Sequence, residues 1–160
     1  MIGIGEIVLP VYDPSTIPDE RRIVTQRVIP YVSDQVFQAF CDPEVLANWW
    51  GPKGFTNTFT EFDFREGGLW QFTMHSPDGK DYPNESRFLR IAKPSLIIFD
   101  HLCAPIFQAN LSFHEAPEGC QVHWQMIFED EKTCTNVAKF AKDANEQNLD
   151  RLVAALRARQ

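Results

Sequence analysis

The chain has 160 residues, and its 15 Lys and Arg against 22 Asp and Glu give a formal net charge of −7. This length is enough for one domain with a full hydrophobic core, and 44% of the residues are apolar. The acidic balance argues against binding to nucleic acid or to an anionic membrane, since both attract a basic patch. No apolar run approaches the roughly eighteen residues of a membrane span.

The first segment, residues 1–20, differs in composition from the rest. Prolines recur from Pro10 to Pro18 and favour an extended arm over a helix. The arm's apolar side chains are costly to expose, so we expect the arm to pack on a sheet edge. That edge could belong to the same chain or to a second copy, and a homodimer is the preferred interpretation. Residues 21–160 are expected to form one domain.

The widely spaced cysteines form no C-x-x-C pair, and no Lys or Arg precedes the apolar N-terminal residues as in a secretory signal. Free thiols in a reducing cytoplasm are therefore expected. Next in the chain, a β-branched run predicts a strand over residues 22–29. Two short helices are expected over 34–40 and 43–49, because Ser and Pro stand at their starts.

Residues 55–128 have the pattern of an antiparallel meander, with Gly-, Pro- and Asp-rich turns. Strands are expected over 56–64, 69–75, 82–91, 96–102, 107–114 and 120–128. Several alternate apolar with polar residues, so one face of the sheet should be covered. Residues 133–158 have helical spacing and would form a helix of about 35–40 Å, long enough to cross that face.

Two asparagines interrupt the apolar stripe of this last helix. Asn145 and Asn148 lie on or beside the stripe, next to Ala141 and Ala144. A buried amide needs hydrogen-bond partners. Small and polar residues opposite a curved aromatic sheet would leave room for water or a ligand. The alternative, in which both amides point into solvent, stays open at this point.

Several motifs occur in an order that is typical of one family. They are Asp42-Pro43-Glu44, Trp49-Trp50-Gly51-Pro52, Arg65-Glu66-Gly67-Gly68-x-Trp70, Pro77-Asp78-Gly79 and Leu149-Asp150-Arg151-Leu152. Over about residues 22–158, the chain resembles the heat-shock ATPase activator homologue family of the START-like helix-grip (SRPBCC) superfamily.

The resemblance implies an α+β helix-grip fold. In this fold a curved antiparallel sheet wraps around a long C-terminal helix, and two short helices follow the first strand. The resemblance also implies a ligand cavity, without an assigned reaction. This chain reads Glu146-Gln147-Asn148 where the family often has a Gly-Trp pair, so the helical side of its cavity differs.

The expected function is the binding of a small, largely hydrophobic molecule between the sheet and the last helix, with no cofactor. Aromatic and apolar side chains would form the wall, and an amide or imidazole would add polar contacts. The candidate ligand-binding residues are Trp49, Trp50, Trp70, Phe72, Met74, Phe88, Phe99, His101, Trp124, Met126, Phe140, Ala144 and Asn148.

Two other functions are kept as alternatives. The first is a cyclase- or dehydratase-like enzyme that uses the same cavity, with His101 as its base. The second is a stress-related cochaperone-type interaction protein, which only the family name suggests. No metal site is expected, because His101 and Cys103 supply two ligands where zinc needs three or four.

Overall fold

The computed structural model describes residues 10–159, and within them seven strands form one antiparallel sheet in the order β1-β7-β6-β5-β4-β3-β2. The strands are β1 (Arg22–Ile29), β2 (Thr56–Phe62), β3 (Leu69–His75), β4 (Asp81–Ala92), β5 (Leu96–His101), β6 (Phe107–Ala116) and β7 (Gly119–Ile127). The α-helices are α1 (Ser33–Cys41), α2 (Pro43–Trp49) and α3 (Glu131–Ala158). The predicted α+β class and order of elements are confirmed.

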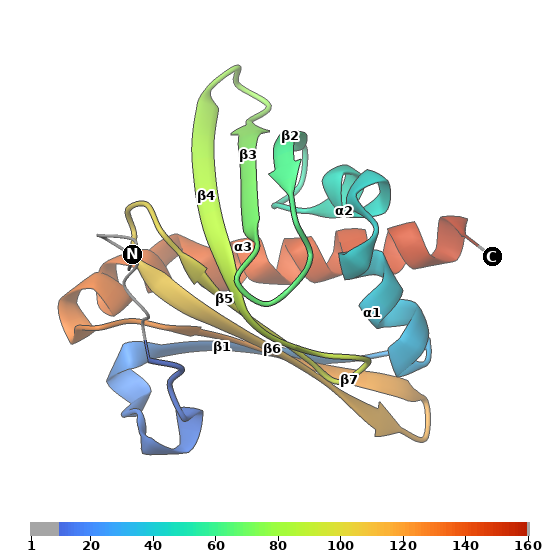
Figure 1. Ribbon diagram of the computed structural model, residues 1–160, viewed down its shortest axis with the longest axis horizontal. Helices are drawn as coiled ribbons and strands as arrows, with labels where there is room; N and C mark the ends of the chain where they lie inside the picture. Colours follow the sequence, from blue (N-terminus) through green and yellow to red (C-terminus); the bar gives the residue numbers. More distant parts are fainter. Residues whose placement is uncertain (1–9, 160) are drawn as a thin grey trace, which may run out of the picture.

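The sheet bends along β4, which pairs with β3 through its first half and with β5 through its second. A register shift between Phe88 and Arg90 marks a bulge in the second half, and bulges bend the strand that carries them. β2, β3 and β4 therefore stand steeply against the part of the sheet that holds β1, β6 and β7 (Figure 1).

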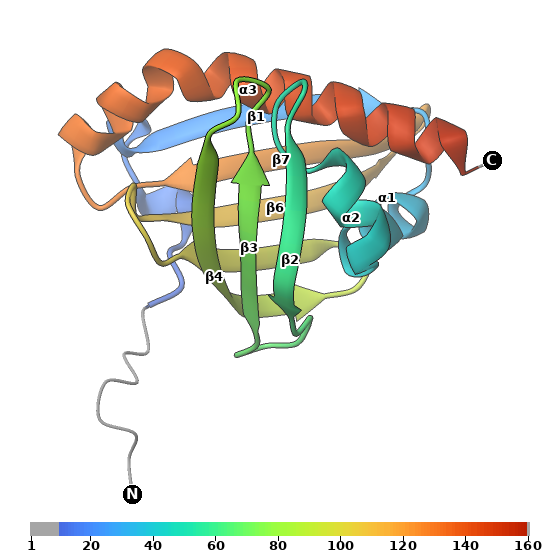
Figure 2. The ribbon, with the colours of Figure 1, turned by 90° about the horizontal axis from the view of Figure 1, so that it is seen from above.

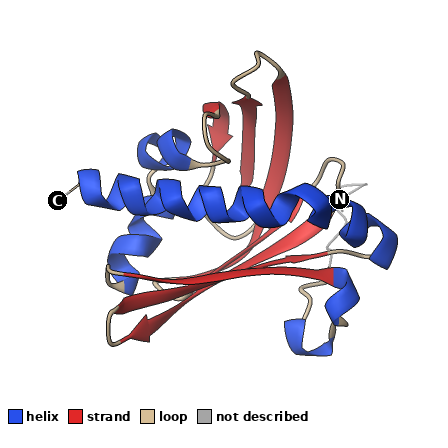
Figure 3. Ribbon diagram, turned by 180° about the vertical axis from the view of Figure 1, so that it is seen from behind, coloured by secondary structure: helices blue, strands red, loops and turns tan. Residues whose placement is uncertain are grey.

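Helix α3 lies along the hollow side of this bent sheet, as the view from above shows (Figure 2). Asp130 caps the helix by accepting a hydrogen bond from the Thr133 backbone N–H at 2.7 Å. Helices α1 and α2 close one end of the hollow (Figure 3). Sheet and helices therefore surround α3 on several sides.

The prolines had predicted that the segment before β1 is extended. The structure shows that it is extended only in part. It contains two 3-10 turns, η1 (Pro14–Thr16) and η2 (Asp19–Arg21). The Tyr12 N–H donates to Gln108 Oε1 at 2.8 Å, and Gln108 Nε2 donates to the Pro10 carbonyl at 3.0 Å. This part of the arm thus packs on its own domain. The apolar residues 1–9 lie outside the described residues, so the homodimer stays a prediction.

Within the described residues, no helix is both long and apolar enough to cross a lipid bilayer.

Candidate functional site

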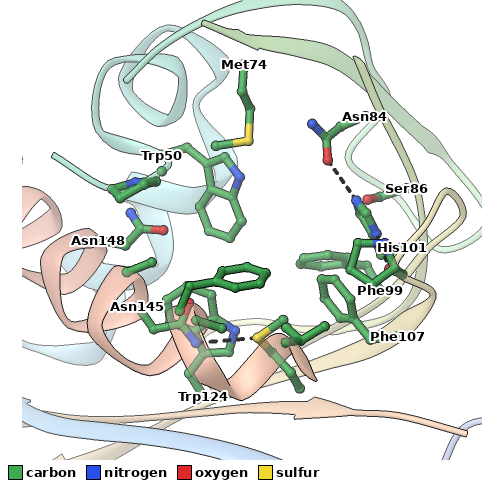
Figure 4. A pocket seen from close by; sticks show the side chains of 18 of the residues that line it. Trp50, Met74, Asn84, Ser86, Phe99, His101, Phe107, Trp124, Asn145 and Asn148 are labelled. Carbon is green, nitrogen blue, oxygen red and sulfur yellow. Dashed lines mark hydrogen bonds between the residues drawn. The ribbon is translucent and has the colours of Figure 1, made fainter. Parts of the chain in front are cut away.

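A cavity of about 210 Å³ lies between the sheet and α3 (Figure 4). Its wall combines residues from the loop after α2, from β3, β4, β5, β6 and β7, from the loop between β5 and β6, and from α3. The lining residues are Trp50, Gly51, Pro52, Trp70, Phe72, Met74, Asn84, Ser86, Phe99, His101, Pro105, Phe107, Trp124, Met126, Val137, Phe140, Ala141, Ala144, Asn145 and Asn148. Phe140 is 63% exposed, so the cavity meets the surface beside this residue.

All of the predicted ligand-binding residues except Trp49 and Phe88 line this cavity. Trp49 points the other way, where its indole N–H donates to the Ala39 carbonyl at 3.0 Å and its ring packs on Phe40 at 4.8 Å. Phe88 shares the inner face of β4 but lies where Phe64 fills the space, 5.0 Å away between ring centroids. Both residues belong to the solid core, and their assignment to the cavity wall was wrong.

The cavity also has lining residues that the sequence interpretation missed. Asn84 and Ser86 precede Phe88 at intervals of two on β4, so strand alternation could have found them. Val137 and Ala141 lie on the same face of α3 as Ala144. The helical spacing of the apolar stripe could therefore have identified them as lining residues. Phe107 begins the alternating apolar face of β6, so strand alternation could have found it as well. Other missed residues, which lie in loops without a periodic signal, are Gly51, Pro52 and Pro105. The path of a loop is not encoded in local periodicity.

Three tryptophans form the centre of the wall. The ring of Trp50 lies 5.2 Å from that of Trp70 and 5.6 Å from that of Trp124, so Trp70 and Trp124 lie on the same face of the sheet. The indole nitrogens of Trp70 and Trp124 are buried and have no hydrogen-bond partner among residues 10–159. The indole of Trp50 projects into the pocket (Figure 4).

The loop that carries Trp50 is held by α3. Asn148 Nδ2 donates to the Trp49 carbonyl at 3.0 Å, and Arg151 donates to the Trp50 carbonyl at 3.1 Å. Gly51 has a φ of 98°, and a Cβ there would lie 2.7 Å from Met74 Cε. The loop therefore needs glycine for both its conformation and its close contact with β3. Asn145 and Asn148 are both buried, which rules out the solvent-facing alternative.

His101 lines the cavity, but both of its ring nitrogens have partners. Nδ1 lies 2.8 Å from the Pro105 carbonyl oxygen and Nε2 lies 2.7 Å from Asn84 Oδ1. Cys103 Sγ is 3.5 Å from Nε2, and the ring stacks on Phe107 at 4.6 Å. Burial lowers the pKa of His101, and hydrogen bonds to the Pro105 and Cys103 backbone oppose this shift. The imidazole is therefore neutral near pH 7.

A neutral imidazole has one N–H, so if Nδ1 donates to Pro105, Nε2 must accept. The Asn84 amide nitrogen donates to the Tyr82 carbonyl at 2.9 Å, so the Cys103 thiol, 3.5 Å from Nε2, is the group that can supply that proton. Neither ring nitrogen is left open toward a substrate. The position of His101 therefore supports a structural or ligand-contacting role better than that of a general base.

A second polar cluster lies outside the cavity, across β2, β3 and β4. Thr58 Oγ1 is 2.8 Å from His75 Nε2, and His75 Nδ1 is 2.7 Å from Asp81 Oδ1. The order hydroxyl, imidazole, carboxylate is that of a hydrolase triad. All three groups are in solvent contact, however, and the cavity wall contains none of them. We interpret the cluster as cross-strand hydrogen bonding.

Within residues 10–159, no group of three or more His, Cys, Asp or Glu could hold a metal.

A curved antiparallel sheet that closes over a cavity with a long C-terminal helix defines the START-like helix-grip class, which is the class of this protein. The family model described as Activator of Hsp90 ATPase homolog 1-like protein matches residues 30–157. The chain belongs to this family, as its motifs had suggested.

Solved structures agree with this assignment of the fold. A protein from Nitrosomonas europaea has a TM-score of 0.83 at 17% identity, over 90% of this chain and 99% of the other. A protein from Mycobacterium smegmatis has a TM-score of 0.80 at 19% identity, over 89% and 94%. An AHSA1-like protein from Aeromonas hydrophila has a TM-score of 0.70 at 20% identity, over 86% and 92%. No curated protein matches the sequence.

Proposed function

We propose that the protein binds a small, largely hydrophobic molecule in the cavity between the sheet and α3. The observation that carries this proposal is the open volume of about 210 Å³ inside an aromatic wall. Protein interiors are close-packed and contain few voids larger than a water molecule. A hollow of this size, which meets the surface beside Phe140, therefore supports a role in binding.

The volume also limits the size of the ligand. A cavity of roughly 150 Å³ lined by apolar side chains holds benzene. The 210 Å³ here accordingly suits a molecule of one or two rings better than a long lipid.

The proposal can be tested with a neutral two-ring fluorescent probe such as 1-naphthylamine, whose emission shifts to shorter wavelengths in apolar surroundings. Ala144→Phe places a ring in the cavity, because Ala144 lines it from α3. Ala154→Phe is the matched control, since Ala154 is exposed on the same helix and away from the cavity. We expect binding by the native protein and the control, and loss in Ala144→Phe. Equal binding by all three would contradict the proposal.

The other candidate functions have less support. A cyclase- or dehydratase-like reaction needs a proton acceptor, and both nitrogens of His101 already have partners. The cochaperone role rests on the family name alone. A cytoplasmic location remains a prediction, supported by the free thiols of Cys41, Cys103, Cys120 and Cys134.

A further inference from the structure

We propose that the cavity selects neutral ring molecules that carry a hydroxyl group or a similar group that donates and accepts hydrogen bonds, and rejects ions of either sign. This inference rests on the proposed function and names the ligand class of the same site. Its first support is the composition of the wall. The lining residues include no Asp, Glu, Lys or Arg.

An ion in this cavity would lose its hydration without gaining a partner of opposite charge. Burial of an unpaired charge is far more costly than burial of a neutral polar group that finds a hydrogen bond. Arg151 lies behind the Trp50 loop, but its guanidinium is already occupied by backbone carbonyls. The net charge of −7 adds long-range repulsion for anions.

The three central tryptophans offer no aromatic box for a cation either. Cation–π binding requires an ion over an open ring face. The ring of Trp50 already contacts those of Trp70 and Trp124, with centroids 5.2 and 5.6 Å away, which leaves no slot between them.

The polar atoms of the wall instead suit a neutral group. Trp50, Asn145 and Asn148 lie on one side of the pocket, and Ser86 and His101 lie on the other (Figure 4). Trp50 is 9% exposed and its indole N–H projects into the pocket as a donor. Asn148 uses its amide nitrogen on the Trp49 carbonyl, so its side-chain oxygen remains as an acceptor. A hydroxyl can accept from Trp50 and donate to Asn148.

Four naphthalene derivatives of similar ring size test this selectivity by isothermal titration at pH 7. They are naphthalene, 2-naphthol, 2-naphthoate and 2-naphthylmethylammonium. We expect 2-naphthol to bind more tightly than naphthalene, and each ion to bind at least about tenfold more weakly than 2-naphthol, a difference of about 1.4 kcal/mol. If 2-naphthoate or the ammonium binds as tightly as 2-naphthol, the inference is overturned while the proposed function stands. If none of the four binds, the proposed function fails first.

One substitution tests the polar contact assigned to Trp50. Trp50→Phe removes the indole N–H and keeps an aromatic ring, so the preference for 2-naphthol over naphthalene should shrink. Naphthalene affinity in the same variant reports any general damage to the pocket. An unchanged preference would overturn the role of Trp50 as the donor.

A second substitution supplies the missing charge. Met74 lines the cavity and is only partly buried, so Met74→Lys can present an ammonium there. We expect 2-naphthoate to gain affinity in Met74→Lys and not in Met74→Gln, the uncharged control of similar length. No gain in the lysine variant would show that lack of a counter-charge is not what rejects anions.

Discussion

Arg151 on α3 donates a hydrogen bond to the carbonyl oxygen of Trp50 at 3.1 Å, which joins the long helix to the loop that carries the central tryptophan of the cavity. The same guanidinium donates to Gly51 and Pro52 at 2.9 and 3.0 Å, and to Asn48 and Phe55, each at 2.9 Å. The motif Trp49-Trp50-Gly51-Pro52 and the motif Leu149-Asp150-Arg151-Leu152 lie far apart in the chain, and these hydrogen bonds join them into one structural unit. The positive charge also lies at the C-terminus of α2, where the helix dipole favours it.

Replacement of Arg151 by Met should therefore destabilise the fold and loosen the cavity wall. A single hydrogen bond from a charged group contributes about 1.5–3 kcal/mol to the free energy of unfolding. The contributions of several bonds from one guanidinium are not additive. We expect a loss of about 2–4 kcal/mol in the free energy of unfolding. Urea denaturation followed by tryptophan fluorescence measures it. Arg157→Met, at an exposed site on the same helix, is the control and should change little; equal effects of both changes would refute the anchoring role.

The adjacent tryptophans should respond differently to substitution. Trp49 is 1% exposed and hydrogen-bonded in the core, whereas Trp50 lines the cavity. We expect Trp49→Phe to lower the free energy of unfolding by about 1–3 kcal/mol, from lost packing and an unpaired Ala39 carbonyl. Its affinity for a neutral probe should be unchanged. Trp50→Phe should weaken probe binding. If Trp49→Phe weakens binding as much, the division between core and cavity is wrong.

The sequence predicted most of the scaffold because its signals are local. Residues 22–29 alternate as a strand should, and Pro43 begins α2 as its preference for the first turn indicates. Periodicity could not separate Trp49 from Trp50, because α2 ends at Trp49 and the direction of the Trp50 side chain depends on the path of the loop that follows. Nor could it place Pro105, which lines the cavity from the loop between β5 and β6. These are tertiary relationships with no local signature.

Phe140 offers a test of the surface side of the cavity. It lines the cavity while being 63% exposed, so its removal costs little packing. We expect Phe140→Ala to reduce the affinity for 1-naphthylamine several-fold with almost no change in unfolding by urea. The neighbouring Lys139→Ala, at an exposed site, is the control. Unaltered affinity in Phe140→Ala would place the binding surface deeper in the pocket.

The buried imidazole of His101 should make the fold less stable in mild acid. Its pKa is lowered by burial, while in the unfolded chain it returns to about 6.5. Below about pH 6.5 the unfolded state therefore binds more protons at His101 than the folded state does. The contribution of the neutral His101 to the free energy of unfolding is present above about pH 6.5 and is lost as pH falls toward the folded pKa.

The measurement is the free energy of unfolding at pH 7.5 and at pH 5.0, for the native protein and for His101→Gln. The lowered pKa of His123, caused by burial and by nearby His114 and Arg22, acts in the same direction and is common to both proteins. We therefore expect a smaller loss between the two pH values in His101→Gln than in the native protein. An equal loss in both would mean that His101 is not held neutral by the fold, and would reopen its assignment as a proton acceptor in the cavity.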